Sequence, residues 1–124
     1  MEIHLSNLMW HMRLAYYMMC LAEDEKHKSA HVSAYAMLRA FEEIIDAYGS
    51  MEGIHFHTLY PQKAWKERIK WMKSNKSKIN FIDEWNDLVL LYALISQKKI
   101  HSGKHLEMMM TKVMNRIEQF KYLF

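Results

Sequence analysis

The chain has 124 residues, of which 51% are hydrophobic and 25% are charged, a balance typical of a globular protein and not of a disordered one. This length supports a single domain, residues 1–124, built around one hydrophobic core. The net charge of +3 is too small to indicate a nucleic-acid partner by itself. Three glycines and one proline are too few for the tight turns of an all-β protein, so we expect an all-α fold.

The cysteine content and the hydropathy of the sequence indicate the cellular compartment of the protein. The single cysteine, Cys20, excludes an internal disulfide and fits a reducing environment. The first residues lack the basic region and the cleavage site of a signal peptide. The apolar run at residues 88–95 is too short to span a bilayer, and His11 and Arg13 interrupt an earlier apolar run. The sequence therefore predicts a cytoplasmic protein that does not enter the membrane.

Two stretches in the first half predict helices, because their apolar residues recur at alternating steps of three and four. The first covers residues 5–22 and the second covers residues 34–48. Their apolar stripes are out of phase and the polar run 23–29 separates them, so we expect a turn there; one long bent helix is the alternative. Gly49 is expected to end the second helix in the left-handed conformation.

Three further helices follow. Pro61 suits the first turn of a short third helix that ends near Lys73. Asn80 is expected to cap a fourth helix, and a fifth helix follows Gly103 to the C-terminus. The centre of the fourth helix, residues 88–95, is apolar on every face, so other helices should surround it. The sequence thus predicts an antiparallel up-and-down bundle of four main helices plus a short basic helix.

The short third helix and the residues after it, 62–79, are strongly basic. Seven lysines and arginines stand against the single acid Glu67, with two tryptophans between them. Such a face can hold a phosphate backbone while a tryptophan stacks on a base. The alternative is the solvated face of an amphipathic helix. The predicted nucleic-acid contacts are Lys63, Lys66, Lys70, Lys73 and Trp71.

A second basic cluster, residues 98–105, joins the fourth helix to the fifth. Five residues separate Lys99 from His105. A cation beside a titratable imidazole suits phosphodiester chemistry, because the imidazole moves a proton and the cation stabilises charge on phosphorus. Lys99 and His105 are therefore the predicted catalytic residues. The alternative is a lysine-rich helix end that serves capping alone.

Some histidines have the spacing of metal ligands along a single helix. Asp24, His27 and His31 have such a spacing, as do His101 and His105. Di-iron bundles require a glutamate from each of two helices and a Glu-x-x-His pair from each of two others, and that full set is absent. We therefore expect no metal and no cofactor. A metal-dependent bundle enzyme would require at least three ligands from different helices to converge.

The remaining candidates have structural interpretations. The acidic face of Glu42, Glu43 and Asp46 is expected to pair with Arg39 on the same helix, or with the basic third helix. Cys20 lies among methionines and leucines, so we expect it to be buried and not nucleophilic.

Residues 33–43, at the second predicted helix, are similar in their alanine and aromatic content to the second helix of the HEPN superfamily of small helical domains. The break at Gly49, the loop residue His57 and the order of the helices also resemble that family. Many members carry an arginine, four to six residues and then a histidine near the start of the last long helix. Here Lys99 stands in place of the arginine and Ile100 in place of the polar residue that usually follows.

This resemblance implies RNA binding, or metal-independent RNA cleavage through attack of the ribose 2′-hydroxyl on the adjacent phosphate. Lysine supplies a charge but not the planar fork of arginine, so a degenerate member that binds without cleaving is equally expected. The resemblance also implies a homodimer and a small nucleotidyltransferase partner of the toxin–antitoxin type. The alternative function is a non-enzymatic dimerisation or adaptor protein that binds a partner helix through a methionine-rich surface. Its residues would be Met18, Met19 and Met108 to Met110.

Overall fold

The computed structural model describes residues 2–97 and 102–121. Within these ranges the chain forms helices and turns without any β-strand, so the predicted all-α class is confirmed. The elements are α1 (Glu2–Glu25), α2 (Ala30–Met51), the short 3-10 helix η1 (Phe56–Thr58), α3 (Pro61–Ser74), α4 (Phe81–Ser96) and α5 (Ser102–Lys121). None of these helices has both the length and the apolar character needed to cross a membrane.

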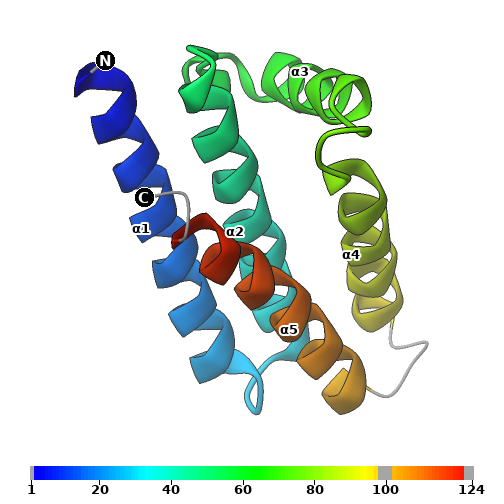
Figure 1. Ribbon diagram of the computed structural model, residues 1–124. Helices are drawn as coiled ribbons and strands as arrows, with labels where there is room; N and C mark the ends of the chain where they lie inside the picture. Colours follow the sequence, from blue (N-terminus) through cyan, green and yellow to red (C-terminus); the bar gives the residue numbers. More distant parts are fainter. Residues whose placement is uncertain (1, 98–101, 122–124) are drawn as a thin grey trace.

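Helix α2 occupies the middle of the molecule (Figure 1). Helix α1 runs antiparallel to it on one side, α4 lies on the other side, and α5 crosses it obliquely. The short helix α3 lies across the end of the molecule at which α2 finishes. Helix α2 packs against α1, α4 and α5. The regular up-and-down order of a four-helix bundle stays a prediction.

The most deeply buried helix is α2 and not α4. Buried residues occur on all sides of α2, between Ser33 and Ser50. The prediction that other helices surround residues 88–95 is wrong, because Leu90 of α4 is 58% exposed. Helix α4 lies at the edge of the molecule, where it packs on α2, α3 and α5 with one side and faces solvent with the other.

The predicted turn between the first two helices is confirmed at residues 26–29. Ser29 caps α2, since its hydroxyl oxygen accepts a hydrogen bond from the backbone N–H of Val32 at 3.2 Å. Two later helix starts are confirmed as well. Pro61 is the first residue of α3, and the side chain of Asn80 caps α4 by accepting from the N–H of Asp83.

Gly49 does not end the second helix as predicted. Helix α2 continues to Met51, and the left-handed residue is Gly53, with a φ of 78°. Gly49 serves close packing instead: a β-carbon at this position would lie 2.6 Å from Cε2 of Phe56. The missing side chain of Gly49 therefore allows η1 to fold back against the last turns of α2.

Aromatic rings fill the space between α2, α3 and α4. Phe41 of α2 stacks on Trp85 of α4 with 6.0 Å between ring centroids, and Trp71 of α3 stacks on Phe81 of α4 at 6.2 Å. Burial of such rings supplies much of the stabilisation of a small core. These contacts fix α3 against the body of the molecule, so that Arg68 on its inner side reaches α2.

Candidate functional site

Buried polar side chains gather where α1, α2, η1 and α3 meet. His11 is 0% exposed, Asp46 is 1% exposed and Glu43 is 6% exposed. Polar and charged groups are buried at a cost in free energy unless they are paired. Each of these three side chains has a partner within hydrogen-bonding distance. The region therefore differs from the rest of the described core, in which the buried polar residues are the serines Ser33 and Ser50.

Helix geometry explains how α1 and α2 supply this cluster. Arg39, Glu42, Glu43 and Asp46 are three or four residues apart, so they share one face of α2. His11 follows Leu8 by three residues and occupies the buried stripe of α1. The side chain that faces the carboxylates of α2 is thus an imidazole, at a point where the apolar repeat of α1 is interrupted.

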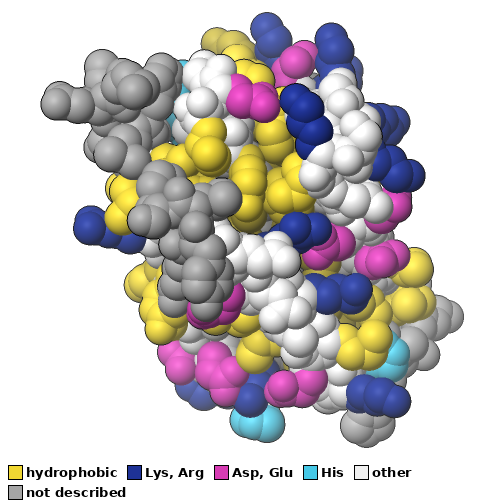
Figure 2. Space-filling model, viewed as in Figure 1, with side chains coloured by type: hydrophobic (Ala, Val, Ile, Leu, Met, Phe, Trp, Pro, Cys, Tyr) yellow, Lys and Arg dark blue, Asp and Glu magenta, His cyan; other side chains and the backbone are white. Residues whose placement is uncertain are grey.

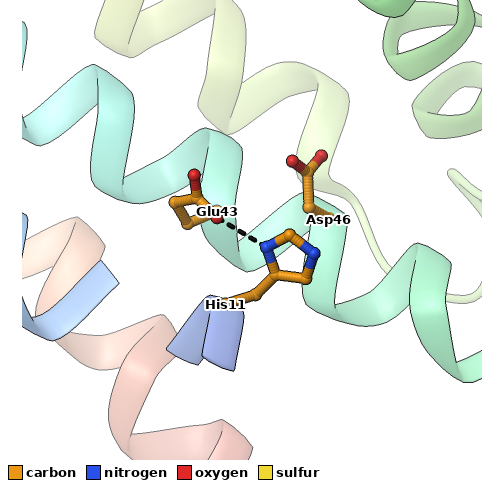
Figure 3. A group of neighbouring side chains, drawn as sticks. All are labelled: His11, Glu43 and Asp46. Atoms are coloured by element: carbon orange, nitrogen blue, oxygen red, sulfur yellow. Dashed lines mark hydrogen bonds and ion pairs between the residues drawn. The ribbon is translucent and has the colours of Figure 1, made fainter. Parts of the chain in front are cut away.

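His11 is the centre of a chain of three side chains. Its Nδ1 lies 2.6 Å from Oε2 of Glu43, and its Nε2 lies 3.2 Å from Nδ1 of His57. Figure 3 shows the imidazole directed at Glu43, with Asp46 on the next turn of α2. A carboxylate accepts hydrogen bonds, so Nδ1 of His11 donates and its Nε2 presents a lone pair to His57.

Two arginines neutralise the carboxylates of α2. Arg68 of α3 donates to both oxygens of Asp46, at 2.7 and 2.9 Å, and its Nη1 lies 3.3 Å from Glu42. Arg39 donates to Glu42 at 2.8 Å and to Glu43 at 3.2 Å. The sequence offered pairing with Arg39 or with the third helix as alternatives, and both are present.

Burial and the neighbouring charges shift the pKa values of Glu42 and Arg68 in opposite directions. Burial raises the pKa of Glu42, although Arg39 and Arg68 act to lower it. Burial alone would lower the pKa of Arg68, but the hydrogen bond and the charge of Asp46 outweigh it and raise that pKa. Arg68 is therefore cationic at any pH at which the protein folds.

A pocket of about 340 Å³ opens beside the cluster. Its polar walls are formed by the two arginines, the three carboxylates and His57, and its apolar walls include Phe56, Pro61 and Trp65. Partial burial is the largest cause that lowers the pKa of His57, so this imidazole is neutral at pH 7. A neutral imidazole beside cations can accept a proton or bind a metal ion.

The predicted catalytic pair does not belong to this pocket. Lys99 lies outside the described residues. His105 lies in the first turn of α5, which begins at the end of the molecule away from α3, and its side chain is half-buried. Because Lys99 is not described, the role of the pair stays a prediction.

The predicted nucleic-acid contacts divide into two groups. Lys63, Lys66, Lys70 and Lys73 are all exposed on α3. Figure 2 shows lysine and arginine side chains along the upper right of the molecule, over α3. Trp71 is buried instead, and its indole N–H donates to a carboxylate oxygen of Glu52 at 2.7 Å. It has no open ring face for a base, which corrects its assignment.

The exposed tryptophan of α3 is Trp65. It is 43% exposed and packs edge-on against Trp85, with 5.3 Å between ring centroids. It lines the pocket of the buried cluster and also a shallow neighbouring pocket with Pro61, Gln62 and Lys66.

Other predictions from the sequence are corrected in part. Cys20 is exposed and not buried. Of the methionines assigned to a partner surface, Met19 and Met109 are in the core, whereas Met108 is 44% exposed. His31 lies 2.9 Å from the hydroxyl of Ser96, so its ring packs towards α4 and not towards Asp24 or His27.

Sequence reasoning missed His11 and Arg68 and read His57 only as a loop residue. These residues are separated by 46 and 11 positions, so no spacing rule within one helix could group them. The one signal in the sequence was the polar residue within the apolar repeat of α1. A histidine in a core stripe requires a polar partner, and only the folded chain shows that this partner is Glu43.

No protein-family model, no curated protein and no solved structure matches the chain. The resemblance to the HEPN superfamily therefore stays a prediction based on residues alone. The fold and the site define an all-α domain with a buried histidine–carboxylate–arginine cluster beside a basic helix.

Proposed function

We propose that this protein binds RNA along the outer face of α3. The observation that carries the proposal is the row of exposed lysines Lys63, Lys66, Lys70 and Lys73. Their spacing of three and four residues keeps them on one side of the helix, and they extend over about 15 Å at a rise of 1.5 Å per residue. That length spans several phosphates of a single strand.

The charges of these lysines are available to a ligand. None of the four forms an ion pair with a residue that the structure describes, whereas the arginines of the buried cluster are held by carboxylates. Binding RNA through free lysines releases counterions without breaking an internal ion pair. Trp65 lies among them with part of its ring exposed, so it supplies the base-stacking surface that the sequence assigned to Trp71.

Charge reversal on α3 tests this proposal. Lys66→Glu/Lys70→Glu is expected to weaken binding of labelled single-stranded RNA by about tenfold or more, because two phosphate contacts become repulsive. The slope of log K against log salt should become shallower by about 1.4, since each contact contributes roughly 0.7 for single strands. Fluorescence anisotropy between about 50 and 200 mM salt measures both quantities.

A variant with the same change in net charge serves as the control. Arg13→Glu/Lys28→Glu reverses two exposed charges, and Lys28 lies in the α1–α2 turn, at the opposite end of the molecule from α3. It should retain most of the affinity. An equal loss in both variants would show that net charge and not the α3 face determines binding. Unchanged affinity in the α3 variant would remove the proposal.

Cleavage can be followed in the same titration with EDTA present. Metal-independent cleavage by Lys99 and His105, the homodimer and the nucleotidyltransferase partner are the further parts of the HEPN proposal, and the sequence resemblance supports them. His105→Ala should abolish such cleavage without affecting binding. Binding without cleavage in the unaltered protein would indicate a degenerate member, as the lysine in place of arginine suggests.

A second candidate function is dimerisation through α1. Trp10, Tyr16 and Tyr17 of this helix are each more than half exposed, and a groove of about 360 Å³ lies between α1 and α5, lined by Tyr16, Met110 and Met114. Exposed aromatic side chains on one helix are typical of an interaction surface. The partner that we infer is a second copy of the chain, as the sequence resemblance also implies.

Light scattering after size exclusion tests the dimer. The protein is expected to elute as a dimer and Tyr17→Glu as a monomer, because a carboxylate in an apolar interface loses its hydration without gaining a partner. Tyr60→Glu is the matched control, since Tyr60 is 85% exposed and directly precedes α3. A monomeric mass for the unaltered protein at every concentration would exclude this second function.

A further inference from the structure

We propose that His11, His57 and Asp46 bind a divalent transition-metal ion. Glu43 would orient His11 through the ring nitrogen that does not bind the ion. The ligands come from α1, from η1 and from α2, so they meet only in the folded chain. His11 and His57 already approach each other to 3.2 Å, and Asp46 lines the same pocket as His57. The proposal does not depend on RNA binding, because none of its residues belongs to the lysine face of α3.

The distance between the two imidazoles is that of two ligands on one ion. Nε2 of His11 and Nδ1 of His57 are 3.2 Å apart. Zinc–nitrogen bonds are about 2.0–2.1 Å long, and a tetrahedral arrangement then places two nitrogens roughly 3.3–3.4 Å apart. A metal ion can therefore replace the proton between these nitrogens with little movement of the backbone.

Glu43 stands where metal sites commonly place a supporting carboxylate. Its Oε2 accepts from Nδ1 of His11 at 2.6 Å, and Arg39 donates to its other oxygen at 3.2 Å. Such a carboxylate fixes the tautomer of a ligating histidine and increases its basicity. The lone pair of His11 is then held on Nε2, which lies 3.2 Å from Nδ1 of His57.

Asp46 supplies the third ligand. One ligand atom each from His11, Glu43 and Asp46 can be chosen so that all three lie within 4.8 Å of one another, but His57 is not part of this group. Asp46 and His57 therefore reach one ion only if one of the two side chains changes its rotamer. Arg68 donates to both oxygens of Asp46, but each oxygen has a second lone pair that remains available. Arg68 is thus placed as the partner that orients a ligating carboxylate, as Glu43 orients His11.

The charge of the surroundings favours a cation. Among the described residues of the cluster, Glu42, Glu43 and Asp46 contribute three negative charges, and Arg39 and Arg68 contribute two positive charges. His55 lies beside His57, with 5.7 Å between ring centroids. A buried excess of negative charge is stabilised by a bound metal ion.

The donor set and the pocket specify the kind of ion. Two imidazole nitrogens and one carboxylate suit Zn²⁺, Co²⁺, Ni²⁺ or Fe²⁺, whereas Mg²⁺ and Ca²⁺ prefer oxygen ligands alone. Asp46 and His57 also line the pocket of about 340 Å³, so a fourth position on the ion would face that pocket. An open position of this kind accepts water or a small ligand.

Cobalt titration tests the site. Untagged protein freed of metal with EDTA is titrated with Co²⁺, and the visible absorption bands of the bound ion are recorded. We expect one Co²⁺ per chain with the intense bands of four- or five-coordination, and displacement by Zn²⁺. His57→Ala should weaken binding by at least 100-fold and remove these bands; because its side chain is largely exposed, the fold should be retained.

Two further variants separate ligation from general effects. Glu43→Gln should keep the bands but weaken binding by about 10–100-fold, the range found for supporting partners of metal ligands. His31→Ala is the control, since His31 contacts Ser96 and Tyr92 and should bind Co²⁺ as the unaltered protein does. Absence of Co²⁺ and Zn²⁺ binding, or unchanged affinity in a folded His57→Ala, would overturn the proposal.

Discussion

Arg68→Ala is expected to lower the free energy of unfolding by about 3–5 kcal/mol, because it leaves a buried carboxylate without its cation. Asp46 is 1% exposed and receives two hydrogen bonds from this guanidinium. Once Arg68 is removed, Asp46 loses both of these hydrogen bonds and the positive charge that balances it. The loss therefore greatly exceeds the contribution of an exposed ion pair, which is about 0–1 kcal/mol.

Urea denaturation followed by circular dichroism measures this difference. Arg13→Ala is the matched control, since Arg13 is an exposed arginine on α1, and it should change stability by no more than about 0.5 kcal/mol. Arg68→Lys should fall between the two, because lysine keeps the charge but cannot bind both oxygens of Asp46 in one plane. A loss below about 1 kcal/mol in Arg68→Ala would mean that Asp46 is hydrated or paired otherwise.

The interactions that the sequence predicted correctly are those between near neighbours. The pairing of Arg39 with Glu42 and Glu43 follows from a separation of three or four residues in one helix. The cap at Asn80 and the start of α3 at Pro61 are likewise local. These features depend only on residues that are close in the sequence. The order and type of the helices could therefore be predicted.

The candidate site was not predictable, because it depends on which helix faces contact each other. The approach of His11 to Glu43 joins residues 32 positions apart, and His57 reaches them from a loop. The apolar content of α4 led to a wrong prediction of its position. A run of apolar residues indicates burial, but the helices in the described part of the chain are too few to cover both α2 and α4. The helix with the small residues, α2, took the central position, since buried alanines such as Ala36 and Ala40 allow its neighbours to approach closely.

A substitution at Gly49 would affect both the packing of η1 against α2 and the position of His57. Gly49→Ala is expected to lower the free energy of unfolding by about 1–3 kcal/mol, the usual cost of an overpacked core. The new methyl group would lie 2.6 Å from Cε2 of Phe56 and 3.3 Å from the carbonyl oxygen of Ile54, so η1 must shift. Gly103→Ala is the control, because a β-carbon there meets nothing within 4 Å. It should stabilise α5 by up to about 1 kcal/mol.

The two substitutions should therefore change the thermal midpoint in opposite directions, and a change in the same direction would contradict the close packing of Gly49. Phe56→Leu provides a second check, because a smaller side chain should remove part of the cost of Gly49→Ala in a double-mutant cycle. Phe56 directly precedes His57, so a displaced η1 also moves the His57 imidazole away from His11. Gly49→Ala should accordingly weaken Co²⁺ binding while Gly103→Ala leaves it unchanged, since the 3.2 Å approach of the two imidazoles depends on the absence of a side chain at residue 49.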